Sequence, residues 1–382
     1  MPWMTLLVSP IDRPSAPATA HSPHWGRAKG VLLAGLMLLA GCTQDAQRIG
    51  LKVSDEHGLQ EPRIEFLGVG GWLLHWRGES LLLAPSFSNP ALLGVEGLPP
   101  LGVAVDAQKI DRYMPEAADV SMLLVGHAHY DHLMDVSRVM QVHTPRAKVY
   151  GNQTVGHVLR AQLPAERIVV PSIDQLSHHR DPAYRGTWFY SSGEQVRDGA
   201  VSWPSGHPAT GRIRAMPLHS MHAGHIFRTN LIPGAYGHDL EQLPSHTLDW
   251  KPGYPTLAWV IDLLGDDGRP VYRIHYQDSA SDPPFGFPPM IADAKAFDVA
   301  IICAASRDQV SLYPQALLKV LKPRLVLVGH WENFFGNDPT AAPRTLPLQT
   351  PLGLIKDLET MFPEIRVVLP KPLSQVQLPA AQ

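Results

Sequence analysis

The sequence predicts an α/β domain built from stacked layers. Short apolar segments with strand character fill its first part, and strands alternate with helices in its last third. Of the 382 residues, 45% are hydrophobic and 18% are charged, which is a globular balance with enough material for one large core. Strands followed by a β-α-β-α-β run are typical of layered α/β domains. We therefore expect one domain over residues 61–375.

The first strands form a predicted meander. Residues 63–68, 72–76 and 80–84 are apolar, and a turn at residues 77–79 separates the last two. Residues 120–125 form a short apolar run that ends at Gly126, which is typical of a buried strand. We expect a helix over residues 131–142 and a further strand over residues 147–150.

The last third alternates regularly. Residues 256–262 and 271–277 are two predicted strands joined by Gly-Asp-Asp-Gly, a hairpin signal. Strands over residues 298–304, 324–328 and 365–369 then alternate with helices over residues 314–321 and 352–361. The segment 176–255 is rich in Gly, Pro, His and aromatic residues and includes a strand at residues 213–218. Its length and composition suit a wall or cover over a site, or simply a packed loop.

Composition excludes several classes of function. A formal net charge of −3 gives no electrostatic reason to expect nucleic-acid binding. Two cysteines cannot form a disulfide framework or a zinc finger, whereas 19 histidines are abundant. Any metal site must therefore use His and carboxylate ligands. Cys303 lies in an apolar run and is expected to be buried.

The N-terminal segment resembles a targeting signal. Residues 31–40 form an apolar run behind Arg27 and Lys29, too short to span a bilayer but suited to a signal peptide. The run ends in Leu-Ala-Gly-Cys42, which resembles the bacterial lipoprotein signal. The alternatives are an ordinary secretory signal or a buried apolar helix.

The lipoprotein resemblance implies a division of the N-terminal segment. Residues 1–41 would be the signal peptide and residues 42–60 a polar tether, with a lipid anchor on Cys42. Thr43 rather than Asp follows the cysteine, so the resemblance implies a protein of the bacterial cell envelope, at the outer membrane and facing the periplasm.

The segment 124–132 carries the strongest chemical signal. A predicted strand runs out at Gly126 into His127-Ala-His129-Tyr-Asp131-His132. Side chains alternate in an extended chain, so His127 and His129 point the same way. The chain then turns, and Asp131 and His132 can face a second position beside the first. Four ligand-type residues thus converge on one place, a pattern that chance would seldom produce.

This motif resembles that of the metallo-β-lactamase fold superfamily. The resemblance covers most of the chain after the signal peptide and implies a four-layer αββα sandwich with a metal site at one edge, between two sheets. It also implies three further ligands, each after a strand. The candidates are His219 after the strand at 213–218, with His222 as its alternative, then Asp278, then His330. His275, three residues before Asp278, is expected to face the other side.

The resemblance further implies two divalent metal ions. One ion would be held by His127, His129 and His219, the other by Asp131, His132 and His330, and Asp278 would bridge them. His and carboxylate ligands suit Zn²⁺, with Fe or Mn as alternatives. The ions would generate a hydroxide nucleophile, and Asp131 would act as the catalytic residue that orients it.

The stretch 129–133, His-Tyr-Asp-His-Leu, is similar to that of one branch of this superfamily, which contains ascorbate-lactone hydrolases and the phospholipase D acting on N-acyl phosphatidylethanolamine. This favours a phosphodiester or lactone over a lactam, and a small-molecule or lipid substrate. Ala84 departs from the family, which often has Asp there as support for the site. The alternative function is a non-catalytic metal-binding envelope lipoprotein.

Overall fold

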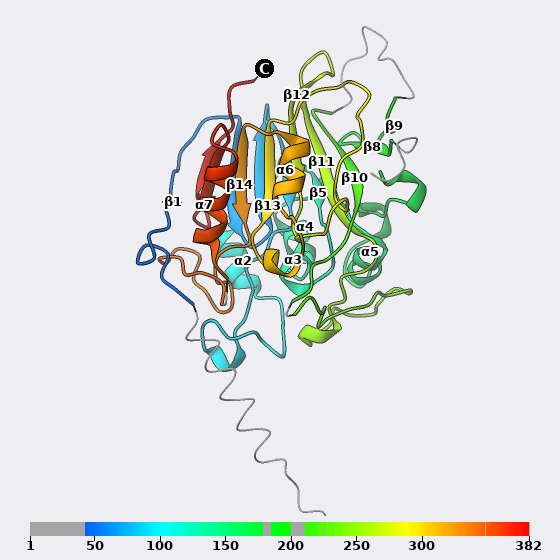
Figure 1. The fold of residues 1–382 in the computed structure, drawn as a ribbon. Helices are drawn as coiled ribbons and strands as arrows, with labels where there is room; N and C mark the ends of the chain where they lie inside the picture. Colours follow the sequence, from blue (N-terminus) through cyan, green and yellow to red (C-terminus); the bar gives the residue numbers. More distant parts are fainter. Residues whose placement is uncertain (1–42, 179–184, 200–210, 226, 348, 382) are drawn as a thin grey trace, which may run out of the picture.

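The computed structural model describes residues 43–178, 185–199, 211–225, 227–347 and 349–381. The predicted signal peptide and Cys42 lie outside these residues. Within the described part, no helix is both long enough and apolar enough to cross a bilayer. The chain folds into two large sheets with helices on their outer faces (Figure 1).

The first sheet has seven strands in the order β16-β2-β3-β4-β5-β6-β7. The meander predicted from the sequence is present as its antiparallel part, and β4 to β7 are parallel. The strands are β2 (Arg63–Gly68), β3 (Gly71–Trp76), β4 (Glu79–Leu83), β5 (Val120–Leu124), β6 (Lys148–Tyr150), β7 (Ile168–Val169) and β16 (Gln375–Gln377).

The second sheet has nine strands in the order β1-β15-β14-β13-β12-β11-β10-β8-β9. The strands β12 to β15 are parallel, and β11 pairs antiparallel with both β10 and β12. The strands are β1 (Val53–Ser54), β8 (Thr187–Tyr190), β9 (Gln195–Arg197), β10 (Ile213–Ser220), β11 (Thr256–Leu264), β12 (Pro270–Tyr276), β13 (Val299–Cys303), β14 (Leu325–Gly329) and β15 (Arg366–Pro370).

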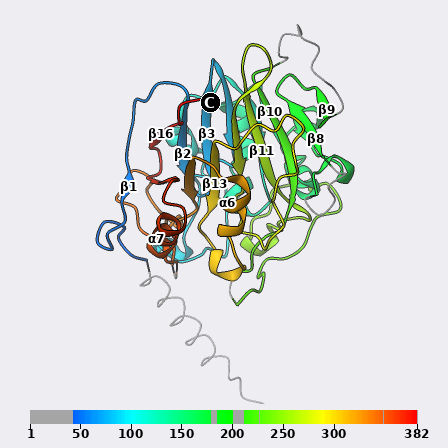
Figure 2. The same cartoon turned by 45° about the horizontal axis from the view of Figure 1, so that its top comes forward.

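Helices cover the outer face of each sheet, which makes four layers (Figures 1 and 2). Apolar side chains of α2, α4 and α5 share one buried cluster with the outer face of the first sheet. Side chains of α6 and α7 pack on the second sheet. The helices are α2 (Ala107–Tyr113), α3 (Tyr130–Leu133), α4 (Val136–Val142), α5 (Gln153–Leu159), α6 (Gln315–Leu321) and α7 (Pro351–Met361). The predicted αββα sandwich is the fold observed.

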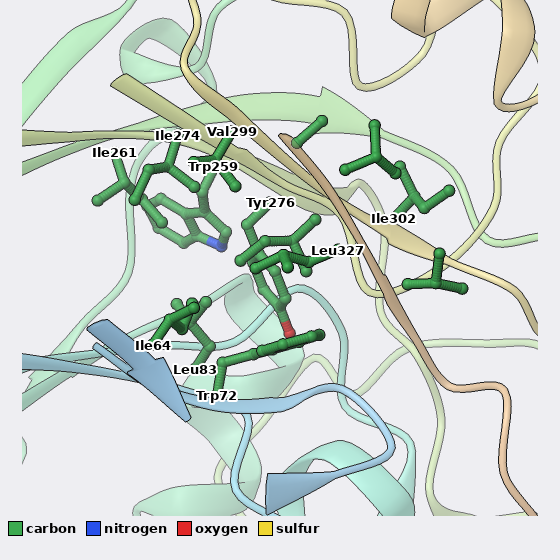
Figure 3. Packing of buried hydrophobic residues seen from close by; sticks show 14 of the residues in the cluster. Ile64, Trp72, Leu83, Trp259, Ile261, Ile274, Tyr276, Val299, Ile302 and Leu327 are labelled. Carbon is green, nitrogen blue, oxygen red and sulfur yellow. The ribbon is translucent and has the colours of Figure 1, made fainter. Parts of the chain in front are cut away.

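The core lies between the two sheets. Figure 3 shows Ile64, Trp72 and Leu83 of the first sheet facing Trp259 and Ile274 of the second. These side chains are almost fully buried. Burying each one away from water stabilises the fold by roughly 1.5–3 kcal/mol. This packing fixes the two sheets against each other and so fixes the edge at which their strands end.

Four sequence expectations differ from the structure. The helix expected over residues 131–142 is two short helices, α3 and α4, with a break at residues 134–135. The strand expected to end at residue 218 continues to Ser220 as β10. The expected tether is not free after residue 42, because Ala46 and Leu51 are buried and β1 pairs with β15. At the other end, the ordered domain extends past residue 375, since β16 runs to Gln377.

Cys303 and the aromatic residues of β8 are all buried. Cys303 is buried as expected, and burial raises the pKa of its thiol. Trp188, Phe189 and Tyr190 are buried within the second sheet, so they support its packing rather than a substrate groove.

Candidate metal centre

The candidate centre lies where strands of both sheets end at one edge. β5 of the first sheet ends at Leu124, and the chain then carries His127, His129, Asp131 and His132 within eight residues. From the second sheet, Asp278 follows β12 by two residues and His330 follows β14 by one. Because β10, β12 and β14 run in one direction, the loops after them open at the same edge.

The side chains form three overlapping groups whose ligand atoms lie within 4.8 Å of one another. Neighbouring imidazole rings have centroids 4.3 to 5.2 Å apart. The groups are His127 with His129 and His222, His127 with His132 and Asp278, and Asp131 with His132 and His330.

Six of the seven predicted ligands are therefore brought together, and His219 is not. His219 lies within β10, where its Nδ1 is 3.0 Å from Nδ1 of His178 and its ring packs against Phe285. His222 takes the place beside His127 and His129. The structure therefore places His222, rather than His219, where the third ligand of the first ion was expected. The reason is the length of β10, since its last residue is Ser220 and the first histidine beyond the strand is His222.

Asp278 connects the two sheets at this edge. Its carboxylate accepts a hydrogen bond from the backbone N–H of Gly126 at 3.1 Å and lies 3.1 Å from Nδ1 of His127. A second contact of 3.5 Å reaches Nδ1 of His132. A Cβ on Gly126 would lie 2.2 Å from this carboxylate. Only glycine at this position therefore lets the Asp278 carboxylate lie so close to the backbone after β5. Asp278 thus lies between the two halves of the cluster, as a bridging ligand would.

A backbone turn from the first sheet covers His132. The turn between β2 and β3 contains Gly70, where a Cβ would lie 2.6 Å from Nδ1 of His132. The hydroxyl of Tyr276 donates to the carbonyl of Gly70 at 2.9 Å and holds the turn in place. Glycine at this position therefore allows the backbone to lie against the imidazole.

His330 has a backbone conformation that non-glycine residues seldom adopt. Its φ is +54°, and its N–H donates to the carbonyl of Val69 at 2.8 Å. The carboxylate of Glu332 in turn accepts from the N–H of Val69. Strained backbone of this kind concentrates at functional sites, where surrounding contacts must maintain it.

Four histidines of the centre are held in the neutral form. Burial lowers the pKa of His127 and of His132 to about 3, and it lowers the pKa of His129 and His222 well below the ordinary value. Burial alone would raise the pKa of Asp131, but His132 and His330 outweigh it and hold that pKa well below its usual value. Neutral imidazole and ionised carboxylate are the forms that bind metal ions.

The residues present fit metal ions. Within the described part of the chain, Nε2 of His127, Nδ1 of His132 and Nδ1 of His330 are buried without a hydrogen-bond partner. The carboxylates of Asp131 and Asp278 make their close ionic contacts with histidines only. Buried polar atoms and carboxylates need partners, and bound cations would supply them.

His225, which was not among the predicted ligands, also lies beside the cluster. Its ring centroid lies 5.5 Å from that of His129 and 5.2 Å from that of His222. Nδ1 of His225 accepts from the N–H of Leu231 at 3.0 Å, which assigns the proton of the neutral ring to Nε2. His225 therefore offers a hydrogen-bond donor beside the cluster. The signal that could have found it is its spacing of three residues from His222.

Three other histidines lie away from the cluster or in solvent, whereas His178 has a histidine partner. His275 is buried and contacts the carbonyl of Gly286 at 2.7 Å, away from the cluster. His238 and His246 are exposed. His178, expected to face solvent, instead contacts His219, and His179 lies outside the described residues.

Comparison with known proteins gives similarities of fold. No family model matches the chain, and no curated protein matches it. Solved structures do match. A metallo hydrolase from the archaeon Ignicoccus hospitalis is 13% identical over 82% of this chain and 97% of its own, with a TM-score of 0.42. A metallo-β-lactamase fold protein from Bacillus subtilis is 13% identical over 82% and 99%, with a TM-score of 0.43.

A third match is an isothiocyanate hydrolase from gut bacteria of Delia radicum. It is 10% identical over 84% of this chain and all of its own, with a TM-score of 0.45. These three structures are a metallo hydrolase, a metallo-β-lactamase fold protein and an isothiocyanate hydrolase. At TM-scores below 0.5 these similarities say nothing about the reaction, which must be inferred from the side chains of the centre.

Proposed function

We propose that the protein is a metal-dependent hydrolase that uses two divalent ions. One observation carries the proposal, namely the convergence of seven ligand-type side chains. Three of their imidazole nitrogens are buried without a hydrogen-bond partner, and the ion pairs of the two carboxylates are with histidines. One ion would be held by His127, His129 and His222, and the other by Asp131, His132 and His330. Asp278 would lie between them.

The chemistry of the ligands favours Zn²⁺, with Fe or Mn as alternatives. When bound, divalent ions polarise a carbonyl or phosphoryl oxygen and lower the pKa of a water molecule. The protein supplies the rest, because the ligands come from rigid strand ends and their partners fix their orientation.

Two side chains have roles besides metal binding. Oδ2 of Asp131 lies 3.2 Å from Nε2 of His330 and stays ionised, so the carboxylate can accept a hydrogen bond from an attacking water and orient it. The Nε2–H of His225 can donate to an oxygen of the substrate as negative charge develops on it.

For the substrate, we propose a phosphodiester or a lactone. The supporting evidence is the similarity of residues 129–133 to the lactonase and phospholipase branch. The structure limits that evidence, because Tyr130 and Leu133 are buried in the core beneath the centre and do not face a substrate. We propose a location at the envelope membrane through Cys42, with no nucleic-acid partner.

The test first measures the metal content of the purified protein. It then compares the rates at which one metal-loaded preparation hydrolyses four substrates. The substrates are bis-(p-nitrophenyl) phosphate, a phospholipid, a simple lactone and a chromogenic cephalosporin. We expect the phosphodiester or lactone to be hydrolysed, and His127→Ala to abolish the activity. His246→Ala is the matched control, since that histidine is exposed and outside the cluster.

The other outcomes are equally specific. Protein without bound transition metal would remove the proposed mechanism. Turnover of the cephalosporin alone would overturn the substrate and leave the metal chemistry intact. Bound metal without turnover of any substrate would favour the alternative, a non-catalytic metal-binding lipoprotein.

A further inference from the structure

Several exposed apolar side chains belong to loops that are hydrogen-bonded to segments of the candidate metal centre. We call six of them the apolar rim, and their exposed fractions range from 40% to 91%. Large apolar side chains gathered on a surface indicate an interaction site rather than chance exposure. The apolar rim comprises Leu93, Val95, Met221, Phe227, Leu231 and Leu312.

Half of the rim belongs to the loop that carries His222 and His225. Met221 precedes His222, and Phe227 and Leu231 follow His225. The loop is closed by the N–H of His225 donating to the carbonyl of Thr229 at 2.9 Å. It is joined to the centre by a 3.3 Å contact between Nε2 of His129 and the carbonyl of Ile232. These rim residues are therefore placed by the same loop that places candidate ligands.

Phe227 is the most exposed of the set. Its side chain is 91% exposed, and both Phe227 and Arg228 have positive φ angles, of 48° and 57°. The N–H of Arg228 donates to the side chain of Gln309 at 2.8 Å, which ties this turn to the loop that holds Leu312. This strained turn therefore presents an aromatic ring to water next to the loop of Leu312.

The rest of the rim lies on the side of His330. The N–H of Gly97 donates to the carbonyl of Phe335 at 3.0 Å, which joins the loop of Leu93 and Val95 to the segment after β14. In that segment, the ring of Phe334 packs on His330 with centroids 5.2 Å apart. The rim thus borders both halves of the centre.

The described chain begins on this same side. The N–H of Thr345 donates to the carbonyl of Gln44 at 2.8 Å, and Thr345 also forms a bridge with Glu332, two residues after His330. Two such pairings place Gln44 roughly 10 Å from the segment that follows β14. Figure 1 shows the start of the described chain at the lower end of the molecule, where α3 also lies. The apolar residues 31–40 and Cys42 directly precede this point in the sequence.

We propose that the apolar rim docks on a lipid bilayer, so that the metal centre opens toward the membrane surface. Apolar and aromatic side chains enter the boundary between head groups and acyl chains, and the guanidinium of Arg228 beside Phe227 suits anionic head groups. An anchor at Cys42 would hold the rim against the same bilayer. Only the consequence for catalysis rests on the proposed hydrolase function.

The experiment reports insertion directly. The full chain is reconstituted into vesicles of phosphatidylethanolamine and phosphatidylglycerol, with Phe227→Cys labelled by an environment-sensitive fluorophore. Met361→Cys is the matched control, because Met361 is also exposed but lies at the far end of α7, near the start of β15. We expect a blue shift and quenching by spin-labelled phospholipid at position 227 and neither at position 361.

A second readout separates docking from catalysis. In the double variant Leu93→Asp and Phe227→Asp, we expect the ratio of vesicle-lipid to soluble-phosphodiester turnover to fall about tenfold, whereas Met361→Asp leaves it unchanged. Equal fluorescence at positions 227 and 361 would overturn the proposal, as would a blue shift at 227 that depends on protein concentration and needs no vesicles. Quenching at 227 without hydrolysis of any substrate would support the docking surface and remove the proposed function.

Discussion

His222 and His219 differ by three positions, and only one of them can join the centre. Both are histidines in the same stretch, Leu-His-Ser-Met-His, so residue type does not separate them. The deciding quantity is where hydrogen bonding of β10 to β11 stops. His219 still pairs with Leu257 in that ladder, whereas His222 lies beyond it, against His127 and His129.

We predict that His222→Ala lowers the metal content of the dialysed protein by about one ion per chain, because it removes a ligand from one of the two groups. His219→Ala is the control, and it should leave the metal content unchanged. Elemental analysis of both variants is the measurement. Loss of metal from His219→Ala, with His222→Ala neutral, would restore the original assignment.

Glu332 is a positioning residue that no sequence motif identified. Its side chain is buried and accepts from the N–H of Val69, whose carbonyl accepts from the N–H of His330. The contact joins the β2–β3 turn to the loop after β14, so it helps to hold His330 in its strained conformation. Its partners are distant in sequence, which is why the pattern of residues alone does not indicate it.

We predict that Glu332→Ala lowers the free energy of unfolding by about 1–3 kcal/mol, because a buried N–H loses its acceptor. Metal affinity should fall by about tenfold or more as His330 loses its support. Denaturant unfolding of the metal-free protein and a chelator competition measure the two effects. Glu332→Gln keeps an acceptor oxygen, and a loss as large as that of the alanine variant would contradict this role.

At the scale of elements, the sequence predicted which segments are strands better than where they end. The meander, the β11–β12 hairpin and the alternating last third are all present, since apolar runs and turn residues are local signals. The end of β10 was misplaced by two residues, because it depends on pairing with β11 and on contacts of Ser220 with Gln277. That difference of two residues decided the identity of a candidate ligand.

The helix after the histidine motif shows the same limit. One helix is expected over residues 131–142, yet the structure has two, α3 and α4, with an interruption that includes Asp135. The carboxylate of Asp135 accepts from the backbone N–H groups of Phe87 and Ser88, at 2.5 and 2.8 Å. A buried tertiary contact of this kind overrides local propensity and cannot be read from the segment itself.

The whole molecule contains a second buried ionic cluster, on the second sheet. Arg273 is fully buried and contacts Asp262 and Asp293, and Arg214 contacts the same two carboxylates. Burial alone would raise the pKa of Asp293, but the hydrogen bond and charge of Arg273 outweigh it and lower the pKa to about 2. Because this cluster belongs to strands β10, β11 and β12 and to the segment after β12, it couples the protonation of one carboxylate to the stability of the fold.

We predict that Asp293→Asn lowers the free energy of unfolding by about 1 kcal/mol at neutral pH, after allowance for its partial exposure. Because the pKa of Asp293 is lower in the folded protein than in the unfolded chain, its carboxylate stabilises the fold fully above about pH 4. This stabilisation is lost as the pH falls through about 2. The difference between wild type and variant should therefore shrink over this interval, as measured by denaturant unfolding at several pH values. The control is Asp267→Asn in the exposed β11–β12 turn, and a constant difference for Asp293→Asn at all pH values would contradict the linkage.

The last prediction concerns the whole molecule and a lipid anchor on Cys42. Residues 43–54 pack on the domain through Thr43, Gln44 and β1, so little free chain separates Cys42 from the folded body. A lipid on Cys42 would therefore hold the domain close to the bilayer, with the apolar rim within reach of it.

We predict that the mature chain begins at Cys42 and carries acyl groups there, and that Cys42→Ala abolishes acylation and releases the protein from the membrane fraction. Mass spectrometry of the N-terminal peptide and fractionation measure this, with Cys303→Ala as the control. An N-terminal residue other than Cys42, or unchanged fractionation of Cys42→Ala, would refute the anchor. If Cys42→Ala still binds membranes weakly and adding Phe227→Asp removes that binding, the remaining binding comes from the apolar rim alone.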